Sequence, residues 1–79
     1  MAEKITTTLV DQASATVYYV GTAFKNNATS EPVWTIIRIT LDSPGAGDVV
    51  IDNVIDDGSG NLIKPGFATW DNRTSLTYG

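Results

Sequence analysis

The 79-residue chain contains no cysteine and no histidine. The lack of cysteine excludes disulfide bonds and thiolate metal sites, and the lack of histidine removes the commonest metal ligand and the usual general base. Domains of this size bury a modest fraction of their surface, and most need a disulfide, a metal or a partner subunit for stability. We therefore expect oligomerisation, or docking into a larger assembly, to supply that stabilisation.

Positive charge is also scarce. Five Lys and Arg residues stand against nine Asp and Glu, which gives a net charge of −4 and a pI of about 4.3. Nucleic-acid binding depends on clustered cations that neutralise phosphates, so no nucleic-acid partner is expected. No apolar run approaches the roughly 20 residues of a membrane span, and the first residues do not resemble a signal peptide. We expect synthesis in the cytoplasm and no membrane association.

Good helix formers are sparse, whereas β-branched residues are frequent, which favours an all-β chain. The longest β-type run spans residues 33–41, and we interpret it as a central strand. Alternation places an almost wholly apolar set on one face: Val33, Thr35, Ile37, Ile39 and Leu41. The opposite face is mixed: Trp34, Ile36, Arg38 and Thr40. The apolar face is predicted to lie against a core, and the mixed face to be only partly covered.

Further strands are predicted at residues 15–24 and 48–55, the second joined to the central strand as an antiparallel hairpin because a parallel crossover needs about a dozen residues. Tyr18 and Tyr19 must point to opposite faces, and Gly21 predicts a bulge or a close backbone approach. Turn residues predict turns at these segments: Asp42–Gly47, with a type II turn at Pro44-Gly45, then Asp56–Asn61 and Lys64–Gly66.

The remaining residues alternate less clearly. Residues 67–70 are predicted to form a short strand, and residues 70–79 a last strand. In that last strand one face would carry these residues: Trp70, Asn72, Thr74, Leu76 and Tyr78. The fold predicted for residues 15–79 is a single small all-β domain of four to five antiparallel strands, arranged as a β-sandwich or barrel. Residues 1–14 are predicted to be an N-terminal arm, either loose or added as a strand to a neighbour; a short helix over residues 9–15 is also compatible.

An acidic segment invites a calcium hypothesis. Its oxygen-bearing side chains are those of Asp52, Asp56, Asp57 and Asn61. Calcium binds six to eight oxygen ligands, but the spacing lacks the ordered alternation and terminal Glu of an EF-hand loop. Asp, Asn and Gly also serve the backbone geometry of a solvated hairpin turn, and we favour that interpretation. No cofactor and no metal is predicted.

Aromatic and guanidinium side chains are the candidate functional residues, because such groups dominate protein interfaces. The predicted interface residues are Tyr18, Tyr19, Trp34, Arg38, Trp70, Arg73 and Tyr78. Asp71 and Arg73 would share a strand face and form a local or intersubunit ion pair. The aromatic members are alternatively a platform for stacking on sugars. No pairing of a nucleophile with a base is present, so we predict no enzyme and no catalytic residue.

Several segments together resemble small structural (virion) proteins of tailed bacteriophages. They are Tyr19-Val20-Gly21-Thr22-Ala23, Ala28-Thr29-Ser30, Val33-Trp34-Thr35-Ile36-Ile37-Arg38-Ile39 and Trp70-Asp71-Asn72-Arg73-Thr74-Ser75-Leu76-Thr77-Tyr78. Residues 57–67 depart from that pattern, because they form a longer connection than is usual. The resemblance implies a virion component present in many copies, either a capsid accessory or decoration protein or a tail part. It implies contacts with other copies, as a homo-oligomer, and with other virion proteins. The alternative is a host-facing module of the particle that binds a glycan or receptor.

Overall fold

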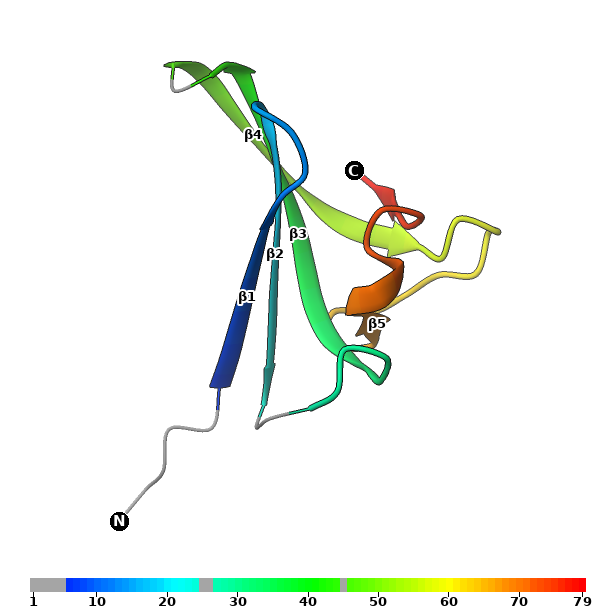
Figure 1. The fold of residues 1–79 in the computed structure, drawn as a ribbon. Helices are drawn as coiled ribbons and strands as arrows, with labels where there is room; N and C mark the ends of the chain where they lie inside the picture. Colours follow the sequence, from blue (N-terminus) through cyan, green and yellow to red (C-terminus); the bar gives the residue numbers. More distant parts are fainter. Residues whose placement is uncertain (1–5, 25–26, 45) are drawn as a thin grey trace.

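The computed structural model describes residues 6–24, 27–44 and 46–79. Its elements are β1 (Thr6–Gln12), β2 (Val17–Phe24), β3 (Pro32–Ser43), β4 (Ala46–Asp56), β5 (Ala68–Thr69), the 3-10 helix η1 (Trp70–Asn72) and β6 (Thr77–Tyr78). The strands belong to one antiparallel sheet in the order β1-β2-β3-β4-β6, and β5 pairs with β3 (Figure 1). The predicted all-β, antiparallel class is confirmed.

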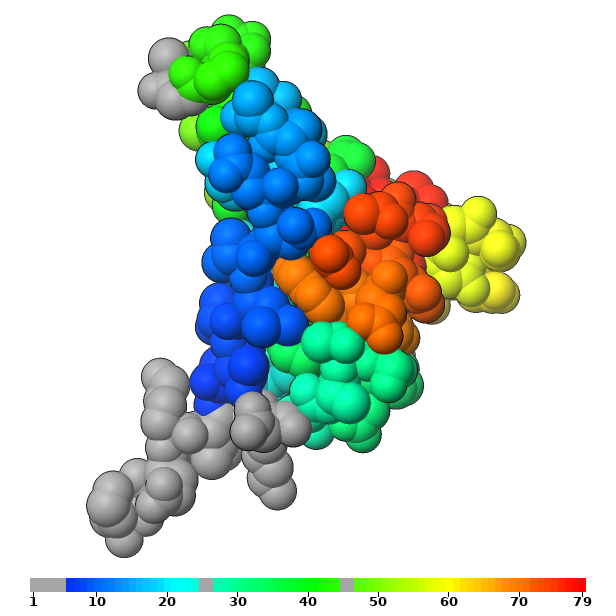
Figure 2. Space-filling view, in the orientation of Figure 1, coloured from blue at the N-terminus to red at the C-terminus, as the bar shows by residue number. Residues whose placement is uncertain are grey.

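The predicted central strand is confirmed as β3, which lies between β2 and β4. Ile39 lies opposite Tyr18 of β2 and opposite Ile51 of β4, so β-branched and aromatic side chains meet across both strand pairs. The hairpin between β3 and β4 is antiparallel, as predicted, and its tip projects beyond the rest of the sheet (Figure 2). The predicted type II turn at Pro44-Gly45 includes Gly45, which lies outside the described residues.

The structure places part of the predicted N-terminal arm in the sheet. Residues 6–12 form β1, which pairs along its whole length with β2, from Thr6 opposite Phe24 to Gln12 opposite Tyr18. The short helix considered for residues 9–15 is therefore wrong. Exposed residues alternate with more buried ones along this strand, with the period of two that suits a pleated sheet. The exposed set is Thr6, Thr8, Val10 and Gln12. The first five residues of the predicted arm lie outside the described residues.

The last part of the chain folds over one side of the sheet instead of forming a single strand. The predicted strand over residues 70–79 is wrong. The Arg73 N–H donates to the Trp70 carbonyl oxygen (3.1 Å) and the Ser75 N–H donates to the Asn72 carbonyl oxygen (2.8 Å), so the chain turns twice. Only β6 is extended within that range. Polar residues between Trp70 and Leu76 favour turns over a strand, and this outweighs their weak alternation.

A small core lies between the sheet and this C-terminal segment. Its buried members are Tyr19, Ala23, Trp34, Ile36, Ala68, Trp70 and Leu76. The predicted close approach at Gly21 is confirmed, because a Cβ atom there would lie 2.5 Å from Cε3 of Trp70. The face prediction for β3 is wrong: Trp34 and Ile36 are buried, whereas the alternating set from Val33 to Leu41 is only half-buried. The C-terminal segment is short and covers one face only, the face whose Gly21 leaves room for the Trp70 ring.

The two later turns form where their residue types predict them. Gly58 and Gly60 both have positive φ in the turn that ends β4, and the Phe67 N–H donates to the Lys64 carbonyl oxygen (3.1 Å) across the next turn. Both predicted turns are confirmed. β5 confirms a short strand within residues 67–70. These turns bring the chain back to β3 from its β4 side and so position the C-terminal segment over the sheet.

Candidate interaction surface

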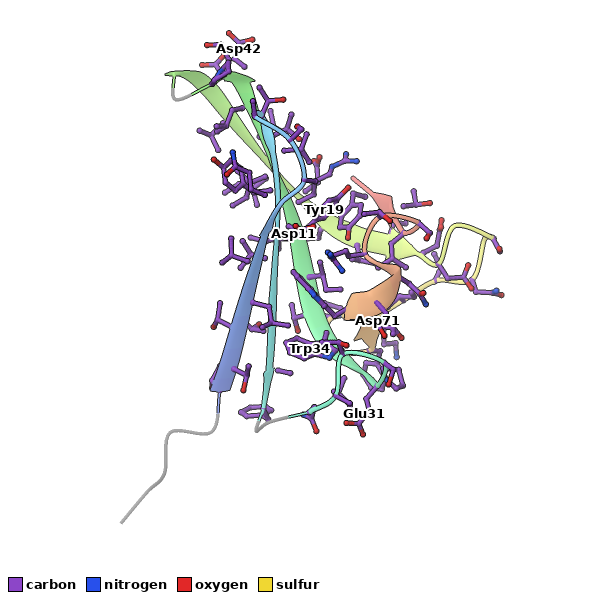
Figure 3. The ribbon with its side chains drawn as sticks, in the orientation of Figure 1. Asp11, Tyr19, Glu31, Trp34, Asp42 and Asp71 are labelled. Atoms are coloured by element: carbon purple, nitrogen blue, oxygen red, sulfur yellow. The ribbon has the colours of Figure 1, made fainter. Side chains whose placement is uncertain are left out.

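Most of the predicted interface residues lie on the covered face of the sheet or in the C-terminal segment that covers it. Figure 3 shows Asp11, Tyr19 and Trp34 on the side of the C-terminal segment. The Trp34 and Trp70 rings pack at a centroid distance of 6.1 Å and an angle of 42°. Trp34 is 1% exposed, so within this fold its side chain has no surface left for a partner. Trp34 and Trp70 therefore belong to the core of a single copy.

The two arginines are also held within the chain. The Arg73 Nε donates to Asp11 Oδ2 (3.0 Å), and its guanidinium carbon lies 4.6 Å from the centre of the Trp70 ring. This contact ties β1 to the C-terminal segment, and Asp11 takes the place of the predicted partner Asp71. Arg38 forms the corresponding bond to Asp52 of β4, also at 3.0 Å. Both arginines bind residues distant in sequence, so local spacing gave no signal of either pair.

Tyr78 completes the covered side. Its ring lies 5.6 Å from that of Tyr19, and its hydroxyl donates to the Arg73 carbonyl oxygen (2.7 Å). Of the seven predicted interface residues, Tyr18 alone points away from the C-terminal segment, because it alternates with Tyr19 along β2. A sugar-stacking platform made of these aromatic residues gains no support, because the paired rings are tilted towards each other inside the molecule.

Among the described residues, the broad surface that the C-terminal segment leaves uncovered is the other side of β1–β4, which we name the open face. The register places these apolar side chains on it: Val10, Tyr18, Val20, Phe24, Val33, Ile37, Ile39, Leu41, Val49 and Ile51. The rest of its side chains are Thr6, Thr8, Gln12, Thr22, Thr35 and Asn53. None of these described residues is charged. Val10 is 65% exposed and Ile51 59% exposed, which is unusual for apolar side chains in the middle of paired strands.

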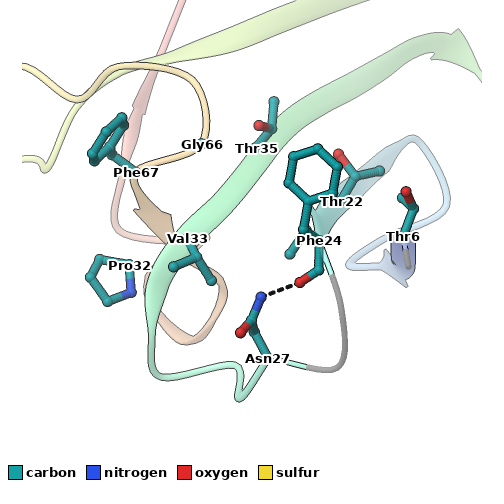
Figure 4. A pocket seen from close by; sticks show the side chains of 10 residues that line it. Thr6, Thr22, Phe24, Asn27, Pro32, Val33, Thr35, Gly66 and Phe67 are labelled. Atoms are coloured by element: carbon teal, nitrogen blue, oxygen red, sulfur yellow. Dashed lines mark hydrogen bonds between the residues drawn. The ribbon is translucent and has the colours of Figure 1, made fainter. Parts of the chain in front are cut away.

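One end of the open face is hollowed. A pocket of about 610 Å³ lies where β2 and β3 meet the turn before β5 (Figure 4). Open-face residues line much of it, among them Thr22, Phe24, Val33 and Thr35, and Phe67 of the turn before β5 also lines it. We name this hollow the end pocket. The hairpin between β3 and β4 lies at the opposite end of the same face.

The acidic turn uses its oxygen atoms on its own backbone. Asp56 Oδ1 accepts the Gly58 N–H (2.8 Å), and Asp57 accepts bonds from the backbone of Ser59 and from the side chain of Asn61, each at 2.8 Å. The bond from the Asn61 side chain, followed by that from the Ser59 N–H, lowers the pKa of Asp57. Among the described residues, no three potential metal ligands of the Asp, Glu, His or Cys type gather in one place. This geometry agrees with the solvated turn that the sequence favours.

The phenol of Tyr78 is expected to ionise late. Burial raises its pKa to about 12, and the nearby Tyr19 adds to this, while Arg38 and Arg73 oppose it. Because the folded state favours the neutral phenol, this contribution to stability is complete below about pH 10, the pKa of an unperturbed tyrosine, and is lost as pH rises towards 12. An absorbance titration should show a late phenolate step that Tyr78→Phe removes. A late step that persists in Tyr78→Phe would assign it to another tyrosine.

Comparison of the chain with protein-family models, with curated proteins and with solved structures finds no match. Within the part of the chain that the structure describes, no helix has the length and apolar character needed to cross a membrane. The assignment of a function therefore depends on the open face and on the sequence resemblance.

Proposed function

We propose that the protein is a structural component of a tailed-phage particle, and that it acts through subunit contacts made by the open face. The observation that carries the proposal is a broad apolar surface free of charged side chains on a chain of net charge −4. The cores of protein interfaces are depleted in charged residues in the same way. The resemblance to phage structural proteins is the reason for proposing a phage particle, and the open face is the contact surface through which the protein would act there.

The size of the open face supports this role. Four strands spaced about 4.8 Å apart, each with about eight residues that rise about 3.3 Å, present roughly 500 Å². Contiguous apolar patches on soluble monomers seldom exceed a few hundred Å², and larger ones mark interaction sites. Covering the open face would remove its valines, isoleucines and leucine from water at about 25 cal/mol per Å² of apolar surface. A partner on this face would also provide the stabilisation that a small domain without disulfides is expected to need.

A charge placed on the open face should abolish association. Ile51 and Val50 are neighbours on β4 with similar exposure, 59% and 51%, but they point to opposite sides of the sheet. We expect Ile51→Lys to raise the dissociation constant at least tenfold, because the ammonium group would have to be buried without a partner. Val50→Lys carries the same substitution on the other side and should leave association unchanged. Light scattering over a dilution series measures both.

Two results for these variants would contradict the proposal that the open face joins copies. If the unmodified protein stays monomeric at all concentrations, the open face does not join copies. If Ile51→Lys and Val50→Lys weaken association equally, the contact lies elsewhere or depends on net charge alone. Circular dichroism of both variants checks that each remains folded. The virion location has its own test, since the protein should be present in many copies in purified particles by quantitative mass spectrometry, and its absence there would exclude this location.

A further inference from the structure

We infer that the open face is covered by a second copy of this chain, in a two-fold dimer whose strands run in opposite directions across the interface. In this dimer the β3–β4 hairpin of each copy covers the end pocket of the other. The inference rests on the proposed function, because it takes the open face as the contact surface, and it adds the identity and orientation of the partner. The product is a β-sandwich with one sheet from each copy.

A second copy suits this surface electrostatically. Each copy carries a net charge of −4, so most pairs of surfaces on two copies would bring like charges together. The described acidic residues of β1–β4 lie on the covered side of the sheet or in its turns, as Asp11 and Asp52 do through their arginine bonds. The open face is therefore the broad surface on which two acidic copies can meet without placing carboxylates against each other.

The area is also sufficient. Two open faces of roughly 500 Å² each would bury about 1,000 Å² together, the lower bound for a specific protein interface. The apolar side chains are mostly β-branched, so burial restricts few rotamers. Stacked sheets lie about 10 Å apart, with their strands within about 30° of a common direction. Two orientations meet these conditions: the two-fold axis runs either along the strands or across them.

The end pocket distinguishes the two orientations. An axis along the strands would place one end pocket over the other and one hairpin over the other, which leaves a double void at one end. An axis across the strands lays each strand over its own counterpart in reverse. The hairpin residues Leu41 and Val49, at one end of the face, then lie over Val33, Thr35 and Phe67 at the other end. Unfilled space forfeits the contacts of the atoms that line it, so packing favours the second orientation.

Disulfide trapping tests this orientation. Because the chain has no native cysteine, every cross-link can be assigned to the introduced residues. Val49→Cys and Phe67→Cys replace exposed side chains, so both variants should fold. We expect mild oxidation of a mixture of the two, one of them tagged, to give mainly the mixed dimer, at least fivefold above either variant alone. A mixture of Val50→Cys with Phe67→Cys is the matched control, because Val50 lies on the other side of β4, and it should not cross-link above background.

Each other outcome overturns a defined part of the inference. An axis along the strands would instead lay β4 of one copy over β1 of the other, with Ile51 over Gln12, because these two residues lie at the same height in the sheet. Efficient cross-linking of Ile51→Cys with Gln12→Cys would therefore show strands running in the same direction and would overturn the orientation. Light scattering that shows a dimer, with no cross-link from any open-face cysteine, would place the second copy elsewhere. A protein that remains monomeric in solution would instead contradict the proposed function, so failure of the orientation and failure of the function give different results.

Discussion

Replacing Trp34 by alanine is expected to remove a large share of the protein's free energy of unfolding. Trp34 is the largest fully buried side chain among the described residues, and its indole N–H donates to the Ala28 carbonyl oxygen (3.1 Å). Truncating a buried aromatic residue to alanine costs about 3–5 kcal/mol. A domain of this length has a total free energy of unfolding of about 4–12 kcal/mol. Urea unfolding followed by far-ultraviolet circular dichroism should show a strongly lowered midpoint.

Two further variants test whether this loss of stability comes from the core. Trp34→Phe keeps most of the apolar volume but loses the hydrogen bond to Ala28, so its midpoint should fall between those of the unmodified protein and Trp34→Ala. Leu62→Ala removes a large apolar side chain that is 81% exposed, and its midpoint should not change. A Trp34→Ala protein as stable as the unmodified one would show that the core does not lie on this face of β3.

The features that the sequence predicts well are those determined by neighbouring residues. The turn after β4 is an example, because the carboxylates of Asp56 and Asp57 bind the backbone of the residues that follow them. Glycine with positive φ in the turn at Lys64–Gly66 is another, and it depends on one residue only. The strands β2, β3 and β4 follow from runs of β-branched residues. In each case the decisive interactions span fewer than about ten residues.

The covered face of β3 could not be predicted in this way, because both of its faces carry large apolar side chains. A prediction from alternation compares the number of apolar residues on the two faces, and that number is higher on the face from Val33 to Leu41. The choice was decided by the C-terminal segment, which begins well beyond β3 in the sequence and brings Trp70 over Gly21. The apolar character of the other face still needs a reason, and the proposed contact between copies provides one. On that proposal both faces of β3 are buried, one within a copy and one between copies.

The predicted interface residues reveal the same limit. Composition identifies aromatic and arginine residues as contact makers, and they do make contacts, but it does not say whether the contacts join two copies or two parts of one chain. Arg73 and Asp11 are separated by 62 positions, so their ion pair depends on the complete fold. The open face, in contrast, has a signal that could have been used: β1–β4 place a row of uncharged residues on the same side once the register is known.

Replacing Gly21 by alanine is expected to destabilise the protein, although strand preference alone predicts the opposite. Gly21 does not have positive φ, and alanine in an ordinary strand position is favoured over glycine by about 0.5–1 kcal/mol. The added methyl group would lie 2.5 Å from Cε3 and 2.6 Å from Cζ3 of Trp70, closer than such atoms can approach. Overpacking of a core costs about 1–3 kcal/mol. The cost of overpacking therefore outweighs the preference of strands for alanine over glycine, and urea unfolding should show a net loss of stability.

A double-mutant cycle isolates the contact between Gly21 and the ring. Trp70→Phe removes the part of the indole that the new methyl group would meet, and on its own it should destabilise the core. If the ring contact causes the loss, Trp70→Phe should cost less in the Gly21→Ala background than in the unmodified protein, by about 1 kcal/mol of coupling. Strictly additive effects would mean that Gly21 does not accommodate the ring, and then the position of the C-terminal segment over the sheet would have to be revised.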